Sequence, residues 1–158
     1  MKKTNKKGFT LVELLAVIVI LGVLLMIAVP AIQNVIKSSR KKAFESAAKL
    51  AIENTETMAS TYNIDGASTN CIVFITETTY NNKSYKGIEL ERGNFGSNPT
   101  GYIEVSNGKG QIYIANDAYS ITNPKTNGID TVAIDSSRNK DAAKIPEGKT
   151  VCQWVETK

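Results

Sequence analysis

A long apolar run dominates the N-terminal part of the hydropathy pattern. From Phe9 to Val29 nearly every residue is apolar, and Glu13 is the only charged residue among these 21. As an α-helix the run would span about 31 Å at 1.5 Å per residue, which matches a bilayer core of roughly 30 Å. Because a backbone in lipid must satisfy its own hydrogen bonds, this pattern predicts a membrane-spanning helix.

Past this run the pattern becomes that of an amphipathic helix. Apolar and small residues recur at spacings of three and four, and charged residues lie mostly around them. The residues expected on the apolar face are Phe44, Ala47, Ala48, Ala51, Thr55, Met58, Ala59 and Tyr62. The two patterns together predict one helix from about residue 10 to 62, bent near Pro30, with an exit loop at residues 63–70.

The rest of the chain has the pattern of short strands and turns. Residues 71–76 form an apolar, β-branched run, for which a short helix is the alternative. Alternating segments at 102–105 and 111–115 flank Asn107-Gly108, which predicts a hairpin. Further strands are expected at 118–122, 131–134 and 151–155. A helix followed by a small antiparallel sheet is an α+β fold.

Charge and composition exclude several classes of function. The net charge is +4, but Lys2, Lys3, Lys6 and Lys7 supply all of it, and the remaining 15 basic residues balance 15 acidic ones. A neutral body lacks the strong positive field of a nucleic-acid binder, so nucleic acid is not an expected partner. The chain has no histidine, which excludes Ser-His-Asp and Cys-His catalysis and His-ligated metals. We expect no catalytic residues, no metal and no cofactor.

The junction between the basic leader and the apolar run carries a specific motif. Lys6-Lys7-Gly8-Phe9-Thr10-Leu11-Val12-Glu13-Leu14 resembles the class III processing site of type IV pilins and pseudopilins, with glycine before the cut and glutamate as the fifth residue after it. The direct resemblance covers about residues 1–35. It implies that a prepilin peptidase cleaves between Gly8 and Phe9 and methylates the new amine of Phe9. It also implies the pilin fold, in which a helical spine carries a small sheet.

The resemblance assigns assembly roles to residues on the predicted membrane helix. A carboxylate in lipid costs about 2.5–3.5 kcal/mol on insertion scales, so Glu13 needs a partner. The amine of Phe9, in the same chain or in a neighbouring subunit, is the expected partner; the alternative is a carboxylate that reaches the headgroups. Gly22 and Pro30 weaken helices and are expected to loosen the helix in a fibre, or else to be a tolerated kink.

The two cysteines, Cys71 and Cys152, fit no metal-ligand or redox spacing. They form either one disulfide across the body or two unrelated buried thiols. A disulfide would require an oxidising compartment, and its place near the C-terminus is similar to disulfide-closed C-terminal loops in some pilins.

The resulting hypothesis is a structural subunit of a type IV pilus, with a pseudopilin of a secretion or DNA-uptake system as the alternative and a membrane-anchored enzyme as a third class. The expected parts are a cleaved leader at 1–8, a transmembrane and assembly helix at 9–36, and a head at 37–158 that contains the amphipathic helix (37–62) and the sheet (71–158). Before assembly the chain would cross the cytoplasmic membrane once, with its N-terminus on the cytoplasmic side and its body outside, although four basic residues on each side of the run make the orientation signal weak. Expected partners are membrane lipid, the prepilin peptidase and methyltransferase, the pilus assembly platform, minor pilins, and further copies in an extracellular helical filament.

Overall fold

The computed structural model describes residues 8–64, 70–90, 94–121, 131–133 and 143–158. The chain divides into two compact units, Met1–Ser39 and Arg40–Lys158. One helix, α1 (Leu11–Ile64), begins in the first unit and ends in the second. The exit loop expected at 63–70 falls mostly outside the described residues, because α1 continues to Ile64 and description resumes at Asn70.

Helix α1 confirms the prediction of a single N-terminal helix. Its 54 residues include Pro30, and the helical assignment runs through both Gly22 and Pro30 without interruption. The first part is rich in Leu, Ile and Val, which form stable helices where the backbone has no water to bond. A long apolar helix of this kind is typically stabilised by the lipid or protein around it more than by the intrinsic helix propensity of its residues.

The part of α1 in the second unit buries one narrow face. Phe44, Ala47, Ala48, Ala51, Thr55 and Ala59 are buried, as predicted, and Tyr62 is half-buried. The alanines let the helix backbone approach the sheet closely, and the buried Thr55 hydroxyl donates to the Ala51 carbonyl at 2.7 Å. Met58 was expected on this face, but its side chain is 51% exposed. The sheet covers only a narrow stripe of α1, which includes Ala59 but not Met58.

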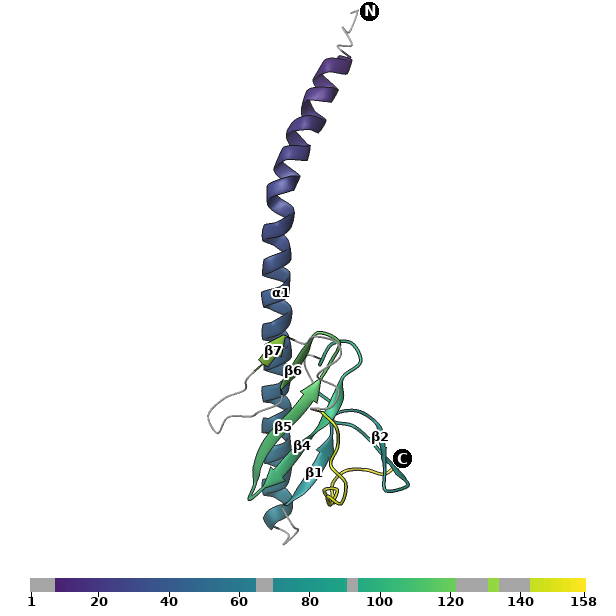
Figure 1. Cartoon of the computed structure of the whole chain (residues 1–158). Helices are drawn as coiled ribbons and strands as arrows, with labels where there is room; N and C mark the ends of the chain where they lie inside the picture. The colour runs from purple at the N-terminus through teal and green to yellow at the C-terminus, as the bar shows by residue number, and fades with distance from the viewer. Residues whose placement is uncertain (1–7, 65–69, 91–93, 122–130, 134–142) are drawn as a thin grey trace, which may run out of the picture. The chain divides into compact units, whose positions relative to one another are not determined.

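Within the described residues the main sheet has five strands, all paired antiparallel, in the order β1-β4-β5-β6-β7 (Figure 1). This confirms the α+β class. The strands are β1 (Cys71–Phe74), β4 (Thr100–Ser106), β5 (Lys109–Ala115), β6 (Tyr119–Ile121) and β7 (Thr131–Ala133). In the run at 71–76, Cys71–Phe74 forms a strand and not a helix. The strands expected at 118–122 and 131–134 are present as Tyr119–Ile121 and Thr131–Ala133, and residues 122 and 134 lie outside the described part of the chain. Residues 122–130, between β6 and β7, lie outside the described part of the chain.

The hairpin of β4 and β5 forms as the sequence predicts. Ser106 pairs with Lys109, so the loop is the two residues Asn107 and Gly108. Both have positive φ, 51° and 75°, which is the conformation that a tight primed turn requires. Glycine adopts it at no steric cost and asparagine tolerates it, so the local sequence determines the register of the sheet's two longest strands.

Alternate side chains of the sheet enter two separate cores. On one face Val73, Ile103, Val105, Ile112 and Ile114 pack with the buried face of α1. On the other face Ile72, Phe74 and Tyr102 pack with Tyr80 of a second hairpin. In β1 the side chains on both faces are therefore buried and apolar, as expected of a strand in a sheet that is covered on both sides.

The second hairpin was missed from the sequence. It consists of β2 (Thr78–Tyr80) and β3 (Lys83–Tyr85), joined by Asn81 and Asn82, which both have positive φ. The Asn-Asn turn between alternating residues was the available signal. The strands are three residues each, too short for a clear period.

The strand expected at 151–155 is not formed. Val151 makes an isolated parallel bridge to Ile72, and the chain then turns, with the Val155 N–H donating to the Cys152 carbonyl at 3.0 Å. The turn redirects the chain toward β3, where the Lys86 N–H donates to the Glu156 carbonyl. Residues 143–158 are called here the C-terminal tail; Ile145, Val151 and Val155 pack with β2 and β3 on the outer face of the sheet, and Cys152 and Trp154 pack with the core on the α1 side.

Candidate processing and assembly site

The start of α1 is defined by a reciprocal pair of interactions between Thr10 and Glu13. The Thr10 backbone N–H and hydroxyl both donate to Oε2 of Glu13, at 2.8 and 2.9 Å. In return the Glu13 N–H donates to the Thr10 hydroxyl at 3.3 Å. This is a capping box, which satisfies backbone donors that a helix end otherwise leaves unpaired. The negative carboxylate also lies at the positive end of the helix dipole.

Sequence reasoning assigned Glu13 to assembly and overlooked Thr10. The signal was present, since Thr10-Leu11-Val12-Glu13 has the spacing of a capping box directly before an apolar run. The structure therefore adds Thr10 to the site, as the residue that holds Glu13.

Gly8 and Phe9 precede the helix and are open to approach. Neither is helical, and the Phe9 side chain is 84% exposed. A Cβ built on Gly8 would have no other heavy atom within 4 Å. The peptide between these residues is therefore outside the helix and unobstructed within the described part of the chain, so a peptidase could approach its backbone closely. Their roles in cleavage and methylation stay predictions.

The apolar part of α1 presents its side chains outward all round. The large apolar residues from Leu11 to Ile36 are between 45% and 79% exposed. In length and composition α1 is able to cross a membrane, and no side chain of its apolar window is buried inside the chain. An exposed apolar surface of this size needs lipid or other protein around it.

Gly22 and Pro30 lie inside this apolar part. A Cβ on Gly22 would meet no other heavy atom within 4 Å, so no neighbour within the described chain requires a glycine there. The helix-loosening role predicted for both residues stays a prediction, since both are helical in the single chain.

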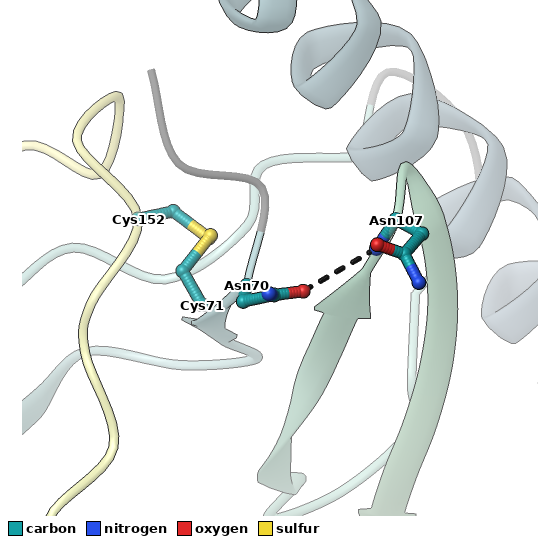
Figure 2. Close-up of a disulfide and its surroundings, with 4 residues drawn as sticks. All are labelled: Asn70, Cys71, Asn107 and Cys152. Carbon is teal, nitrogen blue, oxygen red and sulfur yellow. Dashed lines mark hydrogen bonds between the residues drawn. A yellow bond between two sulfur atoms is a disulfide. The ribbon is translucent and has the colours of Figure 1, made fainter.

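In the body, Cys71 and Cys152 form a disulfide, with their Cα atoms 4.9 Å apart (Figure 2). The bond joins the first residue of β1 to the C-terminal tail, across 81 positions of sequence. Beside it, the Ile72 N–H donates to the Thr150 carbonyl at 2.8 Å and the Cys152 N–H to the Ile72 carbonyl at 3.0 Å. On the other side of Cys71, the Asn70 side chain accepts from the Asn107 N–H at 3.4 Å, which ties the start of β1 to the β4–β5 turn.

Ion pairs and a tyrosine hold the rest of the tail. Lys86 pairs with Glu156, which raises the pKa of the lysine and lowers the pKa of the glutamate through the shared hydrogen bond and the opposite charge. Lys158 pairs with Glu77 at 2.9 Å. The Tyr80 hydroxyl accepts from the tail's own backbone, at the Lys149 N–H, at 2.9 Å.

The hollows of the second unit include two that are lined by described residues. The larger, of about 530 Å³, lies between α1 and the tail and is lined by residues that include Met58, Ile88 and Trp154. The second, of about 450 Å³, is lined by Arg40 and by polar loop residues such as Asn116 and Asp117. Among the described residues no group of three His, Cys, Asp or Glu could hold a metal ion.

Comparison with known families agrees with the geometry at the start of α1. The prokaryotic N-terminal methylation motif, which is the class III prepilin signal of type IV pilins, matches residues 3–29. No match was found among the curated proteins or among the solved structures. The matched segment contains Gly8, Phe9, Thr10 and Glu13 and most of the exposed apolar helix. Over residues 3–29 the chain therefore carries the N-terminal signal that is typical of type IV pilin-like proteins.

Proposed function

We propose that this chain is a structural subunit of a type IV pilus, which is stored in the membrane, cleaved at its N-terminus and then polymerised. The observation that carries the proposal is the methylation motif placed directly before a helix whose apolar side chains are exposed on every side. Such a helix is stable in lipid, and it is equally stable in a bundle of identical helices. The motif is also one of structural pilin-type proteins and not of enzymes.

Processing would occur at the peptide between Gly8 and Phe9. A cut there removes Lys2, Lys3, Lys6 and Lys7 and leaves the whole apolar part of α1 attached to the body. The helix then begins with a bare amine and no longer carries a charged leader that must stay at the cytoplasmic surface. The prepilin peptidase and methyltransferase is the partner that this step requires.

Assembly would use the charge pair between Glu13 and the new amine of Phe9. A lone carboxylate in the membrane is unfavourable by about 2.5–3.5 kcal/mol, and pairing with an amine offsets that penalty. In the fibre the amine would come from a neighbouring copy. Gly22 would let neighbouring helices approach closely, since small residues at helix contacts allow close packing in apolar surroundings. Pro30 would let the helix loosen or bend, since proline removes one backbone hydrogen bond.

Storage before assembly would place the apolar part of α1 across the cytoplasmic membrane. Lys37, Arg40, Lys41 and Lys42 follow the apolar part and carry the charge that binds anionic headgroups. The disulfide between Cys71 and Cys152 requires an oxidising compartment, which favours a body outside the cytoplasm and an N-terminus inside. The assembly platform and minor pilins would act on this stored form.

Electron microscopy tests the proposal directly. An antibody to the body should label fibres on the surface of cells that express the chain, and deletion of its gene should remove those fibres. If fibres are absent and the deletion instead abolishes protein secretion or DNA uptake, the chain is a pseudopilin and the pilus proposal is wrong.

A further inference from the structure

The hollow of about 450 Å³ in the second unit is lined by two described residues of opposite charge, Arg40 and Asp117, whose side chains are both exposed. Within the described part of the chain, Arg40 has no hydrogen-bond or ion-pair partner. The Asp117 carboxylate is bound only at Oδ2, which accepts from the side-chain amide of Asn98 at 2.8 Å. The guanidinium and Oδ1 of Asp117 are therefore both available to one ligand.

Hydrogen bonds through Asn116 join the two loops that line this hollow. Its side chain donates from Nδ2 to the Phe95 carbonyl at 2.6 Å and accepts at Oδ1 from the Tyr119 N–H at 2.6 Å. The Asp117 N–H also donates to the Ser97 carbonyl at 3.2 Å. These bonds hold Asp117 in place before any ligand binds, which lowers the entropy that binding would cost.

The same loops are attached to α1. The ring of Tyr119 lies against that of the buried Phe44, with their centroids 5.7 Å apart. Phe44 follows Arg40 by four residues, so the two lie on neighbouring turns of one face of the helix. A Cβ on Gly96, which has φ of 81°, would lie 2.8 Å from Nδ2 of Asn116, so a glycine is required there. The hollow is therefore a fixed feature of the second unit.

Arg40 lies close in sequence to the apolar part of α1. Ile36 is the last exposed large apolar residue before it, four residues earlier, or about 6 Å along a helix. The headgroup layer on each side of a bilayer is roughly 5–8 Å thick. If the apolar part of α1 spans the membrane, Arg40 lies at the depth of the phospholipid headgroups.

We propose that this hollow binds the headgroup of a zwitterionic phospholipid of the phosphoethanolamine type, with the phosphate on Arg40 and the ammonium on Oδ1 of Asp117. The inference rests on the proposed storage of α1 in the membrane. A guanidinium binds phosphate through charge-assisted hydrogen bonds, and a carboxylate oxygen accepts from an ammonium group. An anionic headgroup without an amine would pair with Arg40 but would leave Asp117 unpaired beside a second negative charge.

Competition between two lipids tests this assignment. The full-length chain in non-ionic detergent is mixed with equal amounts of phosphatidylethanolamine and phosphatidylglycerol that carry the same acyl chains. Native mass spectrometry then measures the ratio of the two lipid-bound forms. We expect Asp117→Asn to lower this ratio about threefold, which is the size expected for one exposed charge pair. The asparagine oxygen can still accept from Asn98, so the loop keeps its hydrogen bond.

Two matched variants exclude a general effect of charge. Glu147→Gln removes an exposed carboxylate outside this hollow and should leave the ratio within about 1.5-fold of wild type. Arg40→Gln should lower the binding of phosphatidylethanolamine about threefold, whereas Lys42→Gln, outside this hollow, should leave it within about 1.5-fold. An unchanged ratio in Asp117→Asn, an equal change in Glu147→Gln, or equal losses in Arg40→Gln and Lys42→Gln would each overturn the inference.

Two other occupants have their own outcomes. If free phosphoethanolamine binds the chain while neither lipid is preferred, the ligand is a soluble one and the lipid assignment is wrong. If Arg40→Gln and Asp117→Asn bind both lipids as wild type does but are lost from fibres, the hollow binds a neighbouring copy, which also overturns the assignment.

Electron microscopy of fibres is read separately from lipid binding. Fibres built from a subunit without lipid preference would overturn only this inference. A preference that depends on Asp117 in a chain that forms no fibres would support the headgroup site and contradict the pilus proposal. A chain that is absent from the membrane fraction would overturn both.

Discussion

Removal of the disulfide is the perturbation whose effect on the body can be worked out most fully. The bond between Cys71 and Cys152 closes a loop across 81 positions. For a loop of this length the chain-entropy treatment gives about 4.5 kcal/mol at 25 °C, and measured values for disulfides are more often about 2–4 kcal/mol. We therefore expect Cys71→Ala/Cys152→Ala to lower the free energy of unfolding by about 3 kcal/mol.

The contacts around the disulfide are consistent with a loss of about 3 kcal/mol in the free energy of unfolding, inside the usual range for disulfides. Backbone hydrogen bonds between Ile72 and the tail, at 2.8 and 3.0 Å, still join the two segments without the disulfide. These bonds, however, flank the disulfide and depend on the segments staying in register, so they cannot replace a covalent link in the unfolded chain. Such a loss is a large part of the total stability of a small domain, which is roughly 5–15 kcal/mol.

The single tryptophan provides the assay. Trp154 lies in the C-terminal tail, with its ring centroid 5.1 Å from that of Tyr62 in α1, so its fluorescence reports whether the tail is docked. The full chain in non-ionic detergent would be unfolded with urea. At a slope of roughly 1.5 kcal/mol per molar urea, the double variant should unfold at a urea concentration about 2 M lower.

A matched control lies in the same tail. Lys158→Ala removes the exposed ion pair to Glu77, and we expect no measurable shift, because exposed pairs contribute little. The reasoning is refuted if the double alanine variant unfolds within about 0.3 M of wild type, since the tail would then be held by its other contacts. An equal shift in both variants would refute it as well.

Three further predictions concern packing and pH. Gly101→Ala should lower the melting temperature and destabilise the body by more than about 2 kcal/mol, because Gly101 has φ of 139° and a Cβ there would lie 2.0 Å from the Tyr113 carbonyl oxygen. Ala51→Leu should cost about 1–3 kcal/mol in the same thermal assay, because Ala51 is fully buried beneath the sheet and a larger side chain has no space. Lys86 lowers the pKa of Glu156, so the carboxyl should titrate below its usual pKa of 4.5 in an NMR pH titration, and Lys86→Ala should raise that midpoint; because both side chains are exposed, the pair contributes little to the docking of the tail, and that contribution is lost as the pH falls below about 4.5 and the carboxyl becomes protonated.

The parts of the fold that local sequence determines were predictable. The apolar run fixes the first part of α1, because only a helix satisfies the backbone in lipid. Asn107-Gly108 fixes the β4–β5 register, because its residues adopt positive φ easily. Thr10 belongs to the same group, since its capping partner is three residues away, and a closer inspection of the motif would have found it.

The parts that depend on distant contacts were not predictable. A strand was expected at 151–155, but the disulfide fixes Cys152 beside Ile72, and the chain must then turn to reach Lys86. Met58 has the helical spacing of a core residue, and its exposure depends on how wide a stripe of α1 the sheet covers. No short segment of sequence determines the path of the tail or the width of the stripe of α1 that the sheet covers.

The most direct test of the account is the mass of the N-terminus of the mature chain. The full-length chain would be expressed with and without a prepilin peptidase, beside a Gly8→Val variant as control, and each product measured by intact mass and by fragmentation. We predict that the peptidase removes residues 1–8 and that the product begins with N-methylated Phe9, while Gly8→Val remains uncleaved. A chain that keeps its leader in the presence of the peptidase, or that is cut elsewhere, would contradict the central claim.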